Sequence, residues 1–366
     1  MSHINRAVTT IIAATALTLH GCGDAPSTRT VAPSATSSAA SNASPSTSSA
    51  TTSTTPATTS ATTSASRESN VLSIQQWTFV SPSGRMIQTP SYRIFTTLGD
   101  GYILQRLPRF AESALAHYTT AFGPLPAPTQ PMETYFLATR PQWARMTQHL
   151  MGRQAELFLR IQRGGYASEA KGVFFEIGPS DSFSLMAHEG WHQYVQATFK
   201  EPLPIWLDEG IATTMEGFRW ARAGADQPVF IAEQNRERFG TLRDAAARKK
   251  LLSLADLLNT SPQQQLVKSD EGTLIYYAQV WALTLYLSKG NDGAHRNQLT
   301  TLLQDAARGD LGRMVSGTFD ARGASIALQS RRGPMVYQTY FDRDLTKAND
   351  SYQAFVRQLV SPGRAR

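Results

Sequence analysis

The sequence predicts an α+β fold with a small mixed sheet in residues 70–180 and a helical half in residues 181–366. Two patterns support this. The first region contains β-branched and aromatic runs that are broken by Pro and Gly, which is typical of short strands. In the second region apolar residues recur at helical spacing. The 366 residues are 41% hydrophobic, which is enough for a sizeable core.

The sheet-rich part is expected to contain several short strands and two helices. Apolar residues at helical spacing predict a helix over 107–122, which ends at Gly123-Pro124, and a shorter one over 141–152, which ends on Gly152. The last two strands should form a hairpin with a short polar turn. The expected strands lie within 73–82, 84–98, 132–139, 165–168 and 172–177.

The helical part is expected to begin with the helix that carries the chemistry. Asp181 or Ser182 supplies its N-cap oxygen, and it runs to about Phe199. A second helix should begin just after Pro204. The rest of the chain shows helical patterns over 251–259, 274–287, 295–309 and 350–360.

The N-terminus has the pattern of a secretory signal. Arg6 precedes a thirteen-residue apolar run that is too short to span a bilayer. The following "LHGC" resembles a bacterial lipobox, which predicts a lipoprotein signal peptide over 1–21 and a lipid anchor on Cys22. An ordinary signal cleaved nearby, with an incidental free thiol, is the alternative. Cys22 is the only cysteine, so no intramolecular disulfide can form.

The resemblance also implies where the protein is located. Gly23, rather than Asp, follows the cysteine. Among lipoproteins that residue favours the outer membrane over inner-membrane retention. We therefore expect an exported protein that is anchored by lipid in the cell envelope, at the outer membrane or cell surface.

Residues 22–69 are expected to be a disordered tether. The segment 26–66 is almost entirely Ser, Thr, Ala and Pro, and lacks the apolar area that would offset its ordering entropy. A flexible coil of about forty residues spans on the order of 35 Å. The tether could act as a spacer or as a linker without a length requirement, and its composition fits both.

The charge of the chain does not indicate a nucleic-acid partner. There are 35 Lys and Arg against 28 Asp and Glu, a formal net charge of +7. The basic residues are scattered, without the aromatic-interleaved stripe of a nucleic-acid surface.

The stretch "MAHEGWHQYV" (186–195) has the spacing of a zinc-peptidase helix. His188 and His192 project from one side of a helix, and Val195 and Phe199 continue that line, so this side faces inward. Glu189 is rotated by about 100° from His188, within reach of a water on the metal. Neutral imidazoles bind Zn²⁺, the metal lowers the pKa of its water toward ~7, and the carboxylate takes the proton.

A third ligand follows in "LPIWLDEGIATTMEG" (203–217), where Glu209 lies on the next expected helix. The pair of motifs, "HEGWH" and "WLDEGIA", resembles the gluzincin zinc metallopeptidases of the peptidase-MA-like group. The resemblance implies a zincin-like catalytic domain over 70–366. It also implies that His188, His192 and Glu209 bind Zn²⁺ and that Glu189 is the general base.

Alternatives stay open at this point. The two histidines could form ordinary hydrogen bonds in the core. Asp208 could replace Glu209 as the ligand, although it points to another face of the helix. Glu216 could support the site or be exposed. Some gluzincins have an acidic residue that orients a ligand histidine at the position of Thr213, so that partner must be weaker here or come from elsewhere.

A hydrogen-bond donor for the oxyanion is expected from the helix over 274–287. Gluzincins use a tyrosine or histidine of a later helix, which favours Tyr277, then Tyr276; otherwise both are core aromatics. In gluzincins an edge strand also pairs with the substrate, and "GGYAS" around Tyr166 is a candidate, although paired glycines also mark bulges. Packing roles are expected for Trp191, Trp206 and Trp281, and no site role for His117, His149 and His295.

The sequence therefore predicts a zinc metallopeptidase that acts on a peptide or protein substrate. A non-catalytic envelope-anchored binding or scaffold protein with a structural metal site is the alternative, although such a site does not need Glu189. A hydrolase of other acyl groups is a third interpretation. The "G-x-M-E-N" stretch of typical aminopeptidases does not occur before the motif.

Overall fold

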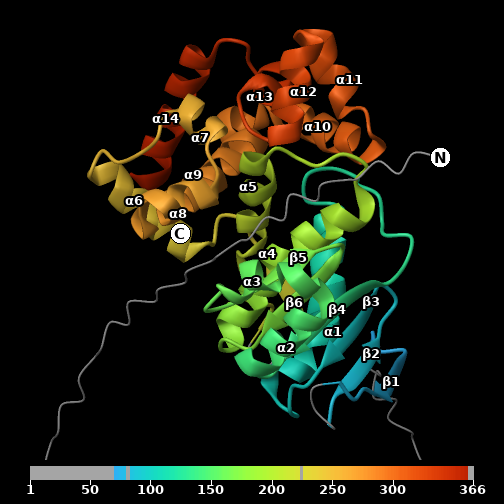
Figure 1. The fold of residues 1–366 in the computed structure, drawn as a ribbon. Helices are drawn as coiled ribbons and strands as arrows, with labels where there is room; N and C mark the ends of the chain where they lie inside the picture. Colours follow the sequence, from blue (N-terminus) through green and yellow to red (C-terminus); the bar gives the residue numbers. More distant parts are fainter. Residues whose placement is uncertain (1–69, 80–82, 223–225, 362–366) are drawn as a thin grey trace, which may run out of the picture. The chain divides into compact units, whose positions relative to one another are not determined.

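The computed structural model describes residues 70–79, 83–222 and 226–361 (Figure 1). The predicted signal peptide 1–21, the lipidation site Cys22 and the tether 22–69 lie outside these residues. The described part has the predicted α+β composition: a six-stranded mixed sheet comes first in the chain, and helices make up the second half. Among its helices, none has both the length and the apolar composition needed to cross a bilayer.

The strands of the main sheet are β1 (Ser73–Gln76), β2 (Arg85–Gln88), β3 (Tyr92–Thr96), β4 (Met132–Leu137), β5 (Gly165–Ser168) and β6 (Lys171–Phe175). Their order is β1-β2-β3-β4-β6-β5. β4 pairs in parallel with β3 and β6, and the other pairs are antiparallel. The predicted hairpin is confirmed as β5–β6, and its turn residues Glu169 and Ala170 have left-handed φ values of 51° and 58°. β5 is therefore an edge strand.

The helices of the sheet-rich part are α1 (Tyr102–Tyr118), α2 (Arg140–Met151), η1 (Gly152–Gln154) and α3 (Ala155–Leu159). The second half contains α4 (Pro179–Thr198), α5 (Ile205–Met215), α6 (Arg236–Ala247), α7 (Leu254–Asn259), α8 (Pro262–Lys268), α9 (Asp270–Lys289), η2 (Gly290–Gly293), α10 (Arg296–Arg308), α11 (Leu311–Thr318), α12 (Ala321–Ser330), α13 (Met335–Tyr340) and α14 (Leu345–Val360). In Figure 1 the helices α7 to α14 gather away from the sheet, and α5 lies between the two groups.

Several boundaries differ from the predictions: α9 begins at Asp270 and α14 at Leu345, four and five residues earlier than expected. α1 begins five residues earlier than expected, because Ile103 and Leu104 extend its buried face by one turn, and it ends at Tyr118. α4 begins at Pro179, after Gly178 with φ 102°, so neither Asp181 nor Ser182 is its N-cap. The hairpin of β7 (Phe218–Trp220) and β8 (Pro228–Phe230) was not predicted.

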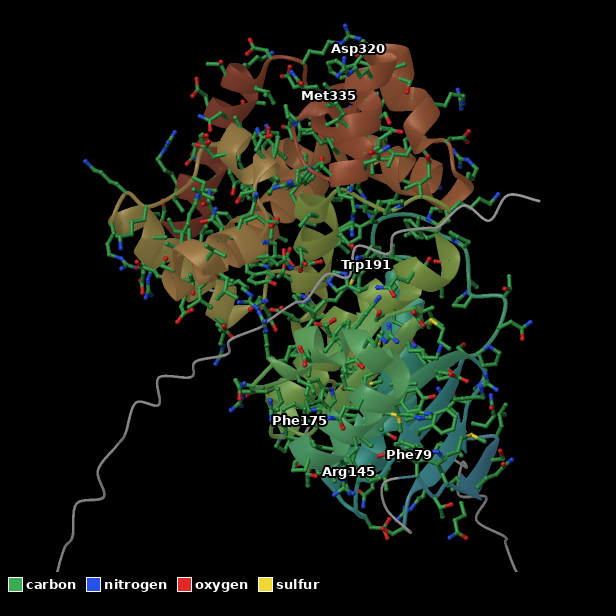
Figure 2. All side chains as sticks on the ribbon, in the orientation of Figure 1. Phe79, Arg145, Phe175, Trp191, Asp320 and Met335 are labelled. Carbon is green, nitrogen blue, oxygen red and sulfur yellow. The ribbon has the colours of Figure 1, made fainter. Side chains whose placement is uncertain are left out.

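The main sheet is covered on both faces. Because side chains alternate along a strand, Phe136 and Leu137 of β4 point to opposite faces. Phe136 belongs to the large core that continues into the helical half. Leu137 belongs to a second core with Trp143 of α2, and Phe175 lies in this second core (Figure 2).

Polar contacts attach α4 to the sheet and to α1. The Gln193 amide donates to Glu133 O (2.7 Å), and its oxygen accepts from Thr134 Oγ1 (3.0 Å), both on β4. On α1, the Tyr118 hydroxyl donates to Ala187 O (2.8 Å). Gln193, Thr134 and Tyr118 are buried, so these bonds hold α4 in one orientation on the sheet. The face with the histidines is turned toward α5.

Candidate metal centre

His188 and His192 project from the same side of α4, as their spacing predicts. Their ring centroids are 5.2 Å apart. α5 brings Glu209 to the same point: Glu209 Oε2 lies 3.5 Å from His188 Nε2 and 3.6 Å from His192 Nε2. The candidate ligand atoms of the three residues all lie within 4.8 Å of one another. The three predicted ligands are therefore together, and this buried group could hold a metal ion.

Close packing of α5 against α9 positions the third ligand. A Cβ on Gly210 would lie only 2.4 Å from Thr284 Oγ1 and 2.7 Å from Val280 O. The helices thus approach more closely than any side chain at position 210 allows. This contact explains the glycine beside Glu209, and it brings Tyr277 of α9 near the histidines.

The buried polar atoms around His188, His192 and Glu209 fit a site that binds a cation. Buried polar side-chain atoms normally have a hydrogen-bond partner. Within the described residues, several buried side-chain atoms of this centre have no hydrogen-bond partner. They are His188 Nε2, His192 Nε2, Glu209 Oε1 and Oε2, Glu189 Oε1, Tyr276 Oη and Tyr277 Oη. Every one of these residues is at most 3% exposed. Two imidazole nitrogens and a carboxylate are donors that suit Zn²⁺, so the residues fit the predicted metal.

Glu216 orients His188. Its Oε1 lies 2.8 Å from His188 Nδ1, which leaves Nε2 directed at Glu209. Arg238, which is 1% exposed, donates from Nη2 and Nε to the two oxygens of Glu216 (3.0 and 3.2 Å), and Asn235 Nδ2 donates to Oε2 (2.6 Å). When Nδ1 carries the proton of a neutral imidazole, Nε2 offers its lone pair to a metal. Glu216 thus supports the site, which was one of its two predicted roles.

Asp208 does the same for His192. Its Oδ1 lies 3.0 Å from His192 Nδ1 and accepts from Trp191 Nε1 (3.0 Å), while Oδ2 accepts from Arg331 Nη2 (2.7 Å). Because these bonds occupy both oxygens, the geometry favours Glu209, not Asp208, as the ligand. Trp191 packs as expected, and it also holds Asp208, a role that its sequence pattern did not predict.

Thr213 does not orient a histidine. Its hydroxyl donates to the backbone oxygens of Glu209 (3.0 Å) and Gly210 (2.7 Å). The orienting carboxylates come from Asp208 and Glu216 instead. Glu216 is the C-cap residue of α5, two turns after Glu209, and this spacing was the available signal.

Glu189 lies beside the three ligands and against the edge strand. It is 1% exposed and accepts a hydrogen bond from the backbone N–H of Ala167 on β5. Burial raises the pKa of Glu189 to about 7, against the lowering effect of His188 and His192. Its carboxyl group therefore titrates near neutral pH, as a general acid or base should.

The other titratable groups balance one another's charges. Burial alone would raise the pKa of Glu209 and lower that of His188. For Glu209, the interactions with His192 and then with His188 outweigh burial and lower its pKa to about 2. For His188, the interactions with Glu209 and then with Glu216 outweigh burial and raise its pKa to about 9. The pKa of Glu216 is lowered to about 2, chiefly by Arg238, although burial opposes this. In the absence of metal the histidines thus hold protons at neutral pH.

Tyr276 and Tyr277 both lie at the centre. The Tyr277 ring centroid is 6.2 Å from that of His188, and the Arg238 guanidinium lies 5.2 Å from the Tyr277 centroid. Burial raises the pKa of both hydroxyls well above the ordinary value, with Glu209 contributing, so both keep their protons and can donate. Tyr277, which contacts a ligand histidine directly, stays the better candidate for the oxyanion donor.

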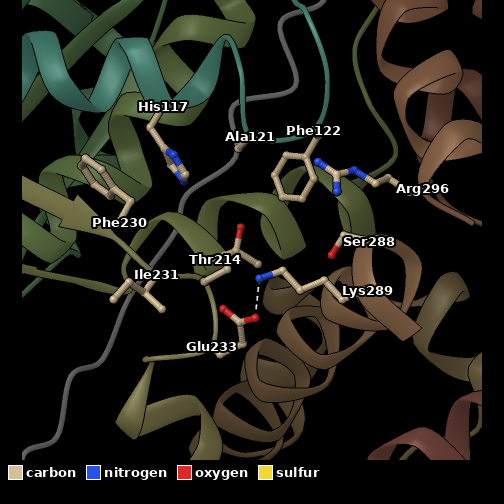
Figure 3. Close-up of a pocket in the computed structure, with 11 residues that line it drawn as sticks. His117, Ala121, Phe122, Thr214, Phe230, Ile231, Glu233, Ser288, Lys289 and Arg296 are labelled. Atoms are coloured by element: carbon tan, nitrogen blue, oxygen red, sulfur yellow. Dashed lines mark hydrogen bonds and ion pairs between the residues drawn. The ribbon is translucent and has the colours of Figure 1, made fainter. Parts of the chain in front are cut away.

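A separate cavity of about 200 Å³ lies between the ends of α1, α5 and α9 (Figure 3). His117 points into it and stacks on Phe230 with centroids 4.8 Å apart. Burial, and then Lys289, lowers the pKa of His117 to about 4. Lys289 itself forms an ion pair with Glu233. None of the candidate ligands lines this cavity, so it is distinct from the metal centre.

Comparison with known protein families and with curated protein sequences gives no match. The functional interpretation therefore rests on the residues of the centre and their geometry.

Proposed function

We propose that the protein is a zinc-dependent metallopeptidase of the gluzincin type. His188 and His192 would bind Zn²⁺ through Nε2, and Glu209 through its carboxylate, which leaves a fourth position open. The observation that carries the proposal is the convergence of these buried atoms, which lack hydrogen-bond partners, with Glu189 Oε1, which also lacks one. Its place in the cell envelope, on a lipid anchor at Cys22, stays a prediction of the sequence.

The residues around the metal would divide the chemistry between them. When bound, Zn²⁺ supplies a Lewis acid that lowers the pKa of water toward ~7 and polarises the scissile carbonyl. The Glu189 carboxylate takes the proton from the attacking water and passes it to the leaving amine nitrogen. In the metal-free centre burial raises the pKa of Glu189 to about 7, and this environment favours uptake of a proton by the carboxylate.

The choice of a peptide as the substrate rests on the resemblance to gluzincins and on the position of the edge strand β5. An extended chain can add to a sheet edge through main-chain hydrogen bonds. Here the four residues of β5 are buried, the Ala167 N–H is bonded to Glu189, and the Ala167 oxygen accepts from Gln196 Nε2 (3.2 Å). A peptide that displaced these contacts and paired with β5 would lie beside the general base.

Complete burial of the centre favours one other candidate, a scaffold protein with a closed structural metal site. Structural zinc sites are closed, whereas catalytic sites keep an open position. Against this, Glu189 has no ligand role. The two candidates differ in one outcome, since only the peptidase cleaves a substrate.

The proposal is tested by incubating the zinc-loaded full chain with a peptide library and identifying new termini by mass spectrometry. We expect cleavage that stops when zinc is chelated and resumes when zinc is restored. A zinc-loaded protein that cleaves nothing would favour the scaffold.

Replacing Tyr277 by Phe is expected to lower kcat by about 10²–10³-fold, the usual cost of losing an oxyanion donor. Zinc content should not change, because the hydroxyl is not a ligand. Tyr276→Phe is the matched control, since it removes the same group from the neighbouring residue. Steady-state kinetics measure kcat for both variants. A larger loss of kcat in Tyr276→Phe would make Tyr276 the oxyanion donor, and an unchanged kcat in Tyr277→Phe would exclude Tyr277 from that role.

Zinc affinity is expected to rise with pH. His188 has a pKa raised to about 9 and that of His192 is raised well above its ordinary value, so zinc must displace protons below pH 9. For each proton that zinc displaces, the zinc affinity should increase about tenfold for every unit by which the pH rises. Competition with a chromophoric chelator between pH 6 and 9 measures this slope. A flat profile would contradict protonated histidines in the metal-free centre.

A further inference from the structure

Arg331 connects a distant turn of the chain to the first turn of α5. It ends α12 with a left-handed φ of 54°. Its backbone oxygen accepts from Ile205 N (2.9 Å), its Nε donates to Leu203 O (2.7 Å), and its Nη2 donates to Asp208 Oδ2 (2.7 Å). The side chains of Arg331 and Asp208 are only 10% and 5% exposed.

These bonds matter because the start of α5 has no other cap. The first N–H groups of a helix have no partner within the helix. The N-cap of α5 is Pro204, which gives no side-chain cap, and the backbone oxygen of Arg331 takes the N–H of Ile205 instead. The turn between α12 and α13 thus fixes the end of α5 on which Asp208 and Glu209 lie.

Asp208 carries this constraint to a candidate ligand. One oxygen faces His192 Nδ1, and the other is held by Arg331. A carboxylate that is bonded on both sides has a single orientation. Without the guanidinium, the buried Oδ2 would lose its charged partner and the carboxylate could rotate away from the imidazole.

We propose that Arg331 is a positioning residue for His192, and that it makes zinc affinity depend on the docking of the α12–α13 turn onto α5. The inference rests on the zinc-binding part of the proposed function and not on hydrolysis. Metal binding and docking are then linked reciprocally: each strengthens the other by the same free energy. The C-terminal helices would thereby contribute to the metal centre without providing a ligand.

The variant Arg331→Gly tests the side chain alone. Glycine adopts φ 54° without strain and keeps the backbone oxygen for Ile205. Arg332→Gly, one residue further on, is the matched control. Zinc affinity is measured by chelator competition on full chains that circular dichroism shows to be folded. We expect Arg331→Gly to bind zinc more weakly by at least about 10-fold and by no more than about 100-fold, the range for loss of Asp208 itself, through which Arg331 acts. Arg332→Gly should keep the affinity of wild type.

A second readout uses the wild-type chain, so it remains informative if the variant does not fold. Hydrogen exchange of the Ile205 amide and of the amides in α12 and α13 is compared with and without zinc. Linkage predicts slower exchange with zinc at these positions. A folded Arg331→Gly chain that binds zinc as tightly as wild type, or exchange that zinc leaves unchanged, would overturn the inference.

The outcomes separate this inference from the proposed function. A wild-type chain that binds zinc but cleaves no peptide would contradict the peptidase and leave the role of Arg331 intact. A wild-type chain that binds no zinc would overturn both.

Discussion

Replacing Glu189 by Gln is expected to leave zinc bound and to lower kcat for peptide hydrolysis by about 10²–10⁴-fold, the contribution of a general base. Gln has the same shape, and its amide oxygen can still accept from the backbone N–H of Ala167. It cannot take a proton from water. Packing and metal ligands are thus preserved while one chemical step is removed.

Glu176→Gln is the control for this variant, because Glu176 is exposed and lies at the end of β6, outside the centre. Zinc content by mass spectrometry and turnover of a cleaved peptide are measured on the same samples. Wild-type turnover in Glu189→Gln would exclude Glu189 as the base. Loss of zinc would instead show that Glu189 binds the metal.

Replacing Glu209 by Gln is expected to weaken zinc binding by more than about 100-fold. Loss of a residue that only orients a ligand costs up to about 100-fold, and loss of a ligand itself should cost more. The substitution keeps the volume of a side chain that is 0% exposed, so the fold should persist. It removes the only carboxylate among the three candidate ligands, and with it the charge that attracts the cation.

Asp208→Asn, one position earlier, decides between the two neighbouring acids. Asp208 bonds His192 Nδ1 and is not a ligand, so its loss should cost only about 10–100-fold in zinc affinity. Chelator competition on both variants gives the ratio. A larger loss in Asp208→Asn than in Glu209→Gln would mean that Asp208 is the ligand and that Glu209 is not.

The part of the centre that could be predicted from sequence depends on local geometry. His188 and His192 share one side of a helix because the helix repeats every 3.6 residues, and the expected helix after Pro204 is confirmed as α5. The edge strand β5 could be found in the same way, from short β-branched and aromatic runs around a polar turn.

The part that could not be predicted depends on contacts between distant segments. Arg331 lies 123 residues after Asp208, and Arg238 lies 22 residues after Glu216, with no periodicity that relates them. Trp191 was expected to pack, and only the fold reveals that its indole N–H reaches Asp208. The start of α4 was misplaced because Asp181, which resembles a cap, instead pairs with Arg163 (2.6 Å).

The proposed function requires that His188, His192 and Glu209 bind one zinc ion. Anomalous diffraction at the zinc edge, from crystals of the zinc-loaded protein, locates that ion. We expect one strong peak at about 2.0–2.2 Å from His188 Nε2, His192 Nε2 and a Glu209 carboxylate oxygen. Crystals that contain zinc but show no peak among these three residues would exclude them as the ligands.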